Sequence, residues 1–577
     1  MIVKTIELLN HLRCRRYGAL HAKSIHHSKD EELILGLNED IEELLSDEES
    51  SEYQSQFTES KSLIRSLFIK HYDSLFPRLI PDVVYQAPFN SDFTLETQID
   101  YLSYTPEETT YIKVNPSSAS HFLKMKYSFD KHKFNLFEKD SDGIYYPKLQ
   151  RVVEGDHTNY FDKLKRCLSR HYDTGRLVYD LGFAEFVISL SSPFDQRRYL
   201  CVLLNPDYIK TEDDALEKNL FVLFDFTNLV ISLQSKIQAD LYRMANLIEL
   251  NDDSRCNLVI DECLLKHPFE CEYTDFCFSH MPKENSVLDY FSSHLGFKEG
   301  PHKSDIHHET YDLINEGIVD MLDVPISWLQ RQKNLMQRYC VENEYTFLNT
   351  KKMKDYLKQL VYPLYFLDFE SYPCPYPRYV GESPYSQSVF QYSLHIRTDN
   401  SSKRLDHIEY LASDHEDHRK ELVEHLLQSI PIGKSSIIVY NMTFEQLRLQ
   451  EFQKLFPEHR IHLKNIEDRL FDLLKLLKTD LHYFLELGYP EEEAKAYNFY
   501  HPMQSGSYSI KKVLKALGQD NYEQLIVQNG VMAYQKYLLI PKLEKSDQKL
   551  AIQALKDYCK QDTLSMVFIL DEIKKHL

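Results

Sequence analysis

The chain has 577 residues, 43% of them hydrophobic, so its length and composition predict at least two globular domains with ample cores. Its 67 basic and 88 acidic side chains give a net charge of −21, which argues against a long basic surface that coats nucleic acid. The sequence has no long apolar run and no signal peptide, so we expect a cytoplasmic protein without a membrane partner. Its ten cysteines are then expected to be reduced or metal-bound rather than paired in disulfides.

The first part of the chain has the pattern of an α/β module. The expected elements, in chain order, are a short helix within 1–26, a solvated linker or exposed helix face over 38–60, strands between 83 and 114, a helix over 159–172, strands over 183–205 and mostly helical structure over 211–250.

The second part predicts another α/β domain, reached through a helical connector. The expected strands are 364–370, 388–397, 407–411 and 435–440, with a helix over 416–429 before the last of them and helices from 444 onward. Three strands, a helix, a strand and further helices follow the order of a ribonuclease-H-like fold. We therefore divide the chain into residues 1–282, a helical connector over 283–360, and residues 361–577.

The stretch Leu364–Glu370 ends an apolar run with two carboxylates. Residues two apart in a strand point to the same face, so Asp368 and Glu370 are expected to leave the sheet side by side. Two like charges at the end of a buried strand cost energy unless a cation neutralises them. The pair therefore predicts a metal site whose remaining ligands come from elsewhere in the chain.

Two later segments contain the candidates for those ligands. Asn441 follows a predicted strand and can cap the turn into a helix whose first turn contains Glu445. Tyr558 and Asp562 are at positions i and i+4 of a strong helical pattern, so they lie on one helix face. Hard oxygen ligands suit two Mg²⁺ or Mn²⁺ ions that hydrolyse phosphodiesters, and the candidate ligands are Asp368, Glu370, Glu445 and Asp562.

These residues form three motifs: Asp-x-Glu on a strand, Asn-x-x-Phe-Glu after a later strand, and Tyr-x-x-x-Asp on a late helix. In this order the motifs resemble those of the DEDD exonuclease superfamily, in its tyrosine-containing subgroup, whose members usually work from a 3′ end. The resemblance implies that Tyr558 helps to position the attacking water. The second motif usually has Asp where this chain has Glu445, and a ligand one methylene longer can change rate and metal preference.

Other stretches are similar to a bacterial family of unknown function that joins a RecB-like N-terminal module to this kind of C-terminal domain. They are residues 381–395, residues 506–514 and Asp562-Thr-Leu. Lys511 and Lys512, in the second of these stretches, can be interpreted equally well as substrate contacts or as part of a solvated helix face. The candidates for contacts with the substrate backbone are Gln387, Gln391, Asn441, Lys511 and Lys512.

The spacing of Cys263, Cys271 and Cys277, with Cys14 far upstream, resembles the iron–sulfur staple of RecB-like nucleases and their CRISPR-associated relatives. The resemblance implies a structural [4Fe-4S] iron–sulfur cluster held by these four thiolates. Such a cluster would close a long loop and restrain the unfolded chain. A Zn²⁺ site is the alternative, because Cys256 offers a local set with the last three cysteines, and buried unligated cysteines are the third interpretation.

A RecB-like nuclease has an acid on one strand and Glu-x-Lys on the next. Asp100 is placed for the first acid, but the next strand has Lys113 and Asn115 where the resemblance calls for Glu and Lys. A cation in the place of a metal ligand should abolish metal binding. The N-terminal module is therefore expected to be a degenerate nuclease kept for binding or scaffolding. Asp100 by itself is expected to be a surface or turn acid.

The sequence thus predicts an α/β protein with an N-terminal restriction-endonuclease-like (RecB-type) module. Its C-terminal domain is expected to be a ribonuclease-H-like DEDD exonuclease domain with a mixed sheet flanked by helices. The first functional hypothesis is a two-metal exonuclease that acts on DNA or RNA, with 3′-to-5′ polarity implied by the resemblance. The second hypothesis is a scaffold that binds nucleic acid or a protein partner and in which both nuclease sites have decayed.

Overall fold

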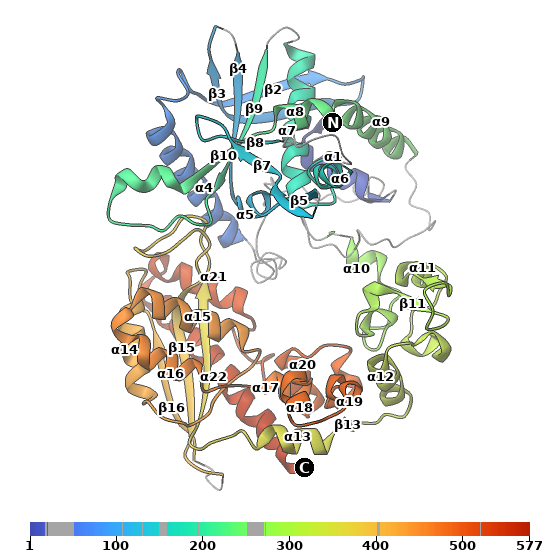
Figure 1. The fold of residues 1–577 in the computed structure, drawn as a ribbon, viewed down its shortest axis with the longest axis vertical. Coiled ribbons are helices and arrows are strands. Elements are labelled where there is room, and N and C mark those ends of the chain that lie inside the picture. The colour runs from blue at the N-terminus through green and yellow to red at the C-terminus, as the bar shows by residue number, and fades with distance from the viewer. Residues whose placement is uncertain are drawn as a thin grey trace. The chain divides into compact units, whose positions relative to one another are not determined.

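The computed structural model forms two compact units, Met1–Phe276 with Pro373–Ser386, and Cys277–Tyr372 with Gln387–Leu577 (Figure 1). Residues 283–360, expected as a connector, therefore belong to the second unit, and a segment inside 361–577 belongs to the first. The structure describes residues 1–14, 16–17, 20, 51–106, 108–129, 131–148, 158–192, 196–250, 263, 271, 273–400, 404–519 and 521–577.

The first unit is built on an eight-stranded mixed sheet with the order β1-β3-β4-β9-β10-β8-β7, and β2 pairs with β3. The strands β2, β3 and β4 are antiparallel, whereas β4 and β9 are parallel. A separate hairpin joins β5 (Lys126–Phe129) to β6 (His132–Asn135). The strands of the sheet are β1 (Ile2–Val3), β2 (Ile80–Pro88), β3 (Thr94–Tyr104), β4 (Thr109–Ser118), β7 (Phe137–Lys139), β8 (Tyr145–Pro147), β9 (Arg197–Leu204) and β10 (Phe221–Asp225).

All of the described helices of this unit except the short helix Thr274–Cys277 contribute to the apolar core around the sheet. The described 3-10 turn before β10 is Asp214–Leu220. Among the described residues the helices are α1 (Thr5–Arg13), α4 (Ser51–Tyr72), α5 (Ser120–Leu123), α6 (Thr158–Cys167), α7 (Asp173–Ser191), α8 (Thr227–Ser232), α9 (Gln234–Leu250) and α10 (Thr274–Cys277), the last of which crosses the boundary between the units.

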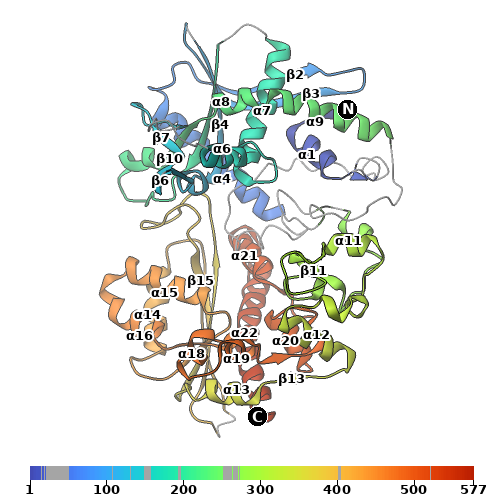
Figure 2. The same ribbon diagram turned by 45° about the vertical axis from the view of Figure 1, so that its right-hand side comes forward.

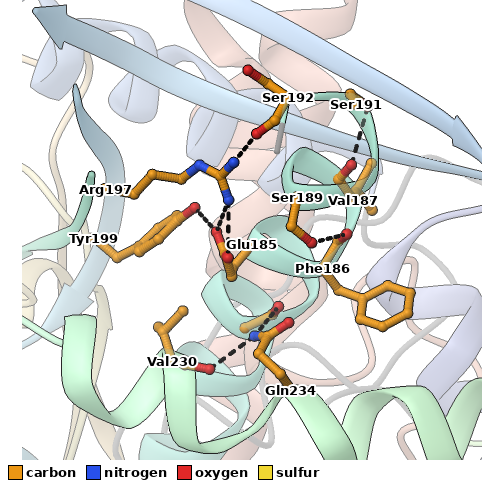
Figure 3. Close-up of polar contacts among 11 residues, drawn as sticks. Glu185, Phe186, Val187, Ser189, Ser191, Ser192, Arg197, Tyr199, Val230 and Gln234 are labelled. Carbon is orange, nitrogen blue, oxygen red and sulfur yellow. Dashed lines mark hydrogen bonds and ion pairs between the residues drawn. The ribbon is translucent and has the colours of Figure 1, made fainter. Parts of the chain in front are cut away.

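The prediction of strands over 183–205 is wrong for its first half, which lies in α7. This helix is buried on most of its circumference, so its apolar run lacks the 3.6-residue periodicity of a surface helix. The guanidinium of Arg197 on β9 donates to both carboxylate oxygens of Glu185 at 3.0 Å, and the Tyr199 hydroxyl donates to the same carboxylate (Figure 3). These contacts fix α7 against the sheet. The expectation of mostly helical structure over 211–250 is also wrong in part, because β10 pairs with β9 there.

The second unit contains a five-stranded sheet with the order β16-β15-β14-β17-β18. The central strand β14 is antiparallel to β15 and parallel to β17, which is in turn parallel to β18. The prediction of a strand at 388–397 is confirmed by β15. The strands are β14 (Leu364–Tyr372), β15 (Ser388–Arg397), β16 (Asp406–Leu411), β17 (Ile437–Val439) and β18 (Leu470–Asp472).

Helices cover both faces of this sheet, as Figure 2 shows for α14 (Arg419–Ser429), α15 (Thr443–Leu455) and α16 (Arg460–Glu467) on one side and α22 (Lys545–Lys575) on the other. The side chains of Tyr365, Leu367 and Phe369 share the apolar core of α14 to α16. Because strand residues alternate between faces, Asp368 and Glu370 point to the opposite face, toward α22. The burial of Tyr365, Leu367 and Phe369 against α14 to α16 therefore directs the two acids to the face that α22 covers.

The expected helical connector is only partly helical. It contains three short helices, several 3-10 turns and the short strands β11 (Phe297–Lys298), β12 (His307–His308) and β13 (Phe347–Leu348), of which β13 pairs with β19 (Phe499–Tyr500). The remaining helices are α11 (Thr310–Asn315), α12 (Gln332–Glu342), α13 (Thr350–Leu357), α17 (Leu473–Leu477), α18 (Leu481–Glu486), α19 (Glu491–Lys495), α20 (Ile510–Ala516) and α21 (Gly530–Leu539). Within the described ranges, no helix combines the length and the apolar character needed to span a membrane.

Candidate metal centre

The central strand β14 and the long helix α22 bring two acids and a thiol together. The Cys559 thiol donates to Asp368 Oδ2 at 3.6 Å. One ligand atom from each of Asp368, Glu370 and Cys559 lies within 4.8 Å of the other two, and the described residues contain no other such group of three. The strand alternation that predicted paired carboxylates is therefore realised, on the face toward α22.

Helix α22 also contains the predicted pair Tyr558 and Asp562, both buried and one turn apart. The hydroxyl of Tyr522, which precedes α21 in the chain, donates to Asp562 Oδ1 at 2.5 Å. The rings of Tyr522 and Tyr558 meet edge to face with centroids 6.3 Å apart. Two tyrosines therefore flank the carboxylate of Asp562.

Glu445 lies in the first turn of α15 and is only 3% exposed. Its Oε2 atom is buried and has no hydrogen-bond partner within the part of the chain that the structure describes. A buried polar atom without a partner costs about 1–3 kcal/mol, so Glu445 is a candidate ligand for a cation.

The expectation that Asn441 caps this helix is wrong. The residue at the N-cap is Met442, without a side-chain cap, and Asn441 has a positive φ of 65°. Asn tolerates this left-handed conformation, which makes the sharp turn out of β17. The Asp472 carboxylate on β18 accepts the Asn441 N–H at 3.1 Å, which holds this turn, and the Leu474 N–H at 2.9 Å, which caps α17.

Burial raises the pKa of every acid at this site, and repulsion from neighbouring acids adds to this for Asp368, Glu370 and Glu445. The pKa values of Asp368 and Glu370 lie well above their usual range because both are buried and close to Asp562. Burial raises the pKa of Glu445 to about 8, with Asp472 adding repulsion. Burial raises the pKa of Asp562 to about 6, against the opposing effects of Tyr522, Lys511 and Tyr558. Without a cation, the fully ionised site is unfavourable.

Of the five predicted substrate-contact residues, only Lys511 acts electrostatically on the acids of this centre among the contacts that the structure describes. The Lys511 ammonium acts electrostatically on Glu370 and Asp562 and lies 5.4 Å from the Tyr522 ring centroid. Lys512 acts instead on Asp289. The amide of Gln391 is buried and donates to the Leu555 carbonyl at 3.0 Å, Gln387 Oε1 accepts from Ser371 at 2.9 Å, and Asn441 occupies the turn described above.

Sequence reasoning missed Cys559 and Tyr522. Cys559 sits at an apolar position of the α22 pattern, where a cysteine is usually a small core residue. Tyr522 is in a loop with no periodic pattern, and only the tertiary fold brings it to Asp562.

Comparison with known proteins gives a family match that covers part of this site. Residues 365–509 match a family described as Domain of unknown function (DUF2779). The match includes Asp368, Glu370 and Glu445 and ends before Tyr522 and Asp562. No match was found among the curated proteins or among the solved structures.

The four predicted cysteine ligands are distributed over both units. Cys14 follows α1, Cys263 is buried and Cys271 is partly exposed, whereas Cys277 belongs to the second unit. Burial raises the pKa of Cys271, on which Arg13 and Cys14 act electrostatically. The alternative ligand Cys256 lies outside the described residues.

The predicted degenerate site of the first unit has its charges paired within the protein. Asp100 is on β3 and buried, and its Oδ2 accepts the Val114 N–H at 2.8 Å, so its expected place at the surface or in a turn is wrong. The Lys113 ammonium donates to Asp180 on α7, an acid that sequence reasoning missed. Asn115 accepts the Ser117 N–H at 2.9 Å.

Proposed function

We propose that the second unit is a metal-dependent exonuclease that hydrolyses phosphodiester bonds of DNA or RNA by a two-metal mechanism. The observation that carries the proposal is the buried cluster of four carboxylates on β14, α15 and α22, in which one oxygen of Glu445 has no partner within the described residues. The residues that would hold two Mg²⁺ or Mn²⁺ ions are Asp368, Glu370, Glu445 and Asp562.

The charges around these acids support a divalent cation. Lys511 opposes the charges of Glu370 and Asp562, and Arg448 opposes that of Glu445. Four carboxylates therefore have few opposing charges, and packing gives no reason to bury them together. A site whose ligands repel one another without a cation is stabilised when the cation binds.

The sheet also supports the proposal. Three antiparallel strands followed by two parallel strands, in the order β16-β15-β14-β17-β18, fit the ribonuclease-H-like arrangement that the motifs imply. The first acids come from the central strand, the third from the helix after β17 and the last from the long C-terminal helix. Each motif thus occurs on the type of element that the resemblance requires.

Ions held by Asp368, Glu370, Glu445 and Asp562 would supply Lewis acidity for the activation of water and for stabilisation of the leaving oxygen. Burial beside Asp562 and Glu370 holds the pKa of Tyr558 well above its usual range, so its hydroxyl keeps its proton. A protonated hydroxyl at this position can donate to the attacking water or to a phosphate oxygen and so orient it. Lys511, close to the same acids, supplies a positive charge for the substrate backbone.

For the first unit we propose binding or scaffolding rather than hydrolysis. The ammonium of Lys113 is paired with Asp180, and the Asp100 carboxylate accepts a backbone N–H. These contacts use the groups that a metal ion would require. The C-terminal centre would then be the working site of the chain.

Degradation of end-labelled strands tests the proposal. Single- and double-stranded DNA and RNA are incubated with the full chain and Mn²⁺ or Mg²⁺, with the label at either end to report polarity. We expect shortening from the 3′ end, and a loss of about a hundredfold or more in the Asp368→Ala variant, because metal ligation contributes several kcal/mol to the barrier. The Asp406→Ala variant, on the edge strand β16, is the matched control. Equal inactivity of wild type and Asp368→Ala on all four substrates would refute the proposal.

A further inference from the structure

Cys559 occupies a position at the candidate centre that the four-carboxylate proposal leaves without a role. Its side chain is completely buried on α22, and its Sγ lies 3.6 Å from Asp368 Oδ2 and 4.0 Å from the Asp368 carbonyl oxygen. The thiol is also within 4.8 Å of a ligand oxygen of Glu370. The thiol therefore points at the oxygens expected to bind the cation.

The distance between the Cys559 thiol and the Asp368 carboxylate is that of two ligands around a single ion. Bonds of about 2.3 Å to sulfur and about 2.1 Å to oxygen, at tetrahedral angles, place the two ligand atoms about 3.6 Å apart. The observed distance between Cys559 Sγ and Asp368 Oδ2 has this value. The third atom, from Glu370, lies within 4.8 Å of both.

A second observation points to a ligand at the same place. Glu445 is buried and acts electrostatically on both Asp368 and Glu370, yet its Oε2 lacks a hydrogen-bond donor among the described residues. A carboxylate oxygen that is buried without a hydrogen-bond donor, close to two further acids, requires a positively charged group nearby. The thiol is thus part of a site that is incomplete without a cation.

We propose that Cys559 is a ligand of this centre and makes it select a thiophilic divalent cation, of the Co²⁺ and Zn²⁺ class, over Mg²⁺. Thiolate sulfur is a soft ligand, whereas Mg²⁺ prefers oxygen ligands and water. On binding, a sulfur–metal bond replaces the sulfur–hydrogen bond, and the proton leaves to solvent. The inference rests on the proposed function, because it adds a ligand to the same centre.

Titration of the metal-free full chain with Co²⁺ alone tests the assignment, since a bond between Co²⁺ and thiolate sulfur produces a near-ultraviolet charge-transfer absorption. Cys559→Ser keeps a hydrogen-bond donor but removes the soft ligand. Cys340→Ser, at another fully buried cysteine on α12 of the same unit, is the matched control. We expect Cys559→Ser alone to lose one equivalent of the absorption and at least about tenfold in Co²⁺ affinity, with Mg²⁺ affinity unchanged.

Cadmium NMR of the wild-type chain provides a measurement that needs no variant. We expect a resonance at the position of one sulfur with several oxygens, distinct from the all-sulfur signal of a four-cysteine site. Resonances only from all-oxygen or all-sulfur sites would overturn the assignment, as would an unchanged Co²⁺ absorption in a folded Cys559→Ser variant.

The outcome is separable from that of the proposed function. Loss of the absorption in Cys559→Ser supports the thiol ligand even if the chain degrades no nucleic acid. Degradation of nucleic acid by a chain whose Co²⁺ absorption is unchanged in Cys559→Ser overturns the thiol ligand and leaves the exonuclease in place.

Discussion

The carboxyl group of Glu445 is where the proposed metal binding would be linked to the stability of the fold. Its pKa is raised from 4.5 to about 8, so the folded chain binds a proton there that the unfolded chain has lost. The metal-free protein should therefore lose stability as pH rises from about 4.5 to about 8. The position is unfavourable for folding without a cation, as expected of a functional ligand.

Replacement of Glu445 by Gln removes this titration. In chelator, we expect the free energy of unfolding of Glu445→Gln to decline less than that of wild type up to pH 8, the value at which the Glu445 carboxyl is half ionised. The stabilisation by Mn²⁺ should fall at the same time, because a ligand is lost. Urea unfolding across this pH range, with and without Mn²⁺, measures both effects. An undiminished stabilisation by Mn²⁺ would contradict the assignment of Glu445 as a ligand.

The two tyrosines beside Asp562 should differ in what they control. Tyr522 donates to Asp562 Oδ1, so Tyr522→Phe should weaken Mn²⁺ binding about 10–100-fold, as removal of a group that orients a ligand does. Tyr558→Phe should lower kcat about a hundredfold and weaken Mn²⁺ binding less than Tyr522→Phe does, because its hydroxyl orients water or phosphate in addition to its effect on Asp562. Calorimetry and steady-state kinetics separate the two effects. A larger loss of Mn²⁺ affinity in Tyr558→Phe than in Tyr522→Phe would contradict these roles.

At the scale of elements, β15 and α22 are joined by a buried network of side-chain hydrogen bonds. His395 Nδ1 and Ser393 Oγ lie 2.8 and 2.9 Å from the Thr563 hydroxyl, next to Asp562 in sequence. The imidazole of His407 on β16 lies 3.0 Å from Ser393 Oγ. These hydrogen bonds fix the rotation of α22 and therefore the direction of its candidate ligands.

The histidines in this set of hydrogen-bonded side chains make the stability of the fold sensitive to acid. Burial, with repulsion from His407 and Lys560, lowers the pKa of His395 from 6.5 to about 4. As pH falls, His395 is protonated in the unfolded protein before it is protonated in the folded protein. The free energy of unfolding should therefore decrease as pH drops from about 6.5 to about 4. His395→Gln should flatten this decline in a pH series of urea unfolding, whereas replacement of the exposed His576 should not. Parallel declines in wild type and His395→Gln would contradict the account.

Elements with strong periodicity could be predicted from the sequence. β15 begins and ends where expected, and the paired acids of β14 follow from strand alternation alone. Helix α7 was missed because a helix buried on most of its surface has no amphipathic period. Asp180, Asp472 and Tyr522 could not be predicted, because their partners lie far away in sequence and are brought close only by the fold.

At the scale of the whole molecule, the segment that follows the central strand β14 packs in the first unit. The Lys210 ammonium donates to the carbonyls of Pro377 and Arg378 at 3.1 and 2.9 Å, and the Lys210 N–H donates to the Glu382 carbonyl at 2.8 Å. The Tyr385 hydroxyl donates to the Pro116 carbonyl at 2.9 Å. A division of the chain at one sequence position would therefore separate residues that fold together.

Hydrogen exchange should reveal how far Lys210 holds this segment. Hydrogen bonds from a charged donor contribute about 1.5–3 kcal/mol, so Lys210→Met should speed exchange in 373–386 by about tenfold or more. The control is Lys236→Met, which removes a similar bond to the Leu168 carbonyl in the same unit. Equal exchange of the segment in Lys210→Met and wild type would show that other contacts hold it.

The most direct test of the central claim is a calorimetric titration of Mn²⁺ into the chelator-treated full chain. Buried carboxylates from β14, α15 and α22 that form one centre predict two bound ions and a higher melting temperature in wild type. Asp368→Asn should lose at least one of these ions, while Asp406→Asn should retain both. Absence of saturable Mn²⁺ binding in wild type, or identical binding in Asp368→Asn, would contradict the claim that these acids form a metal centre.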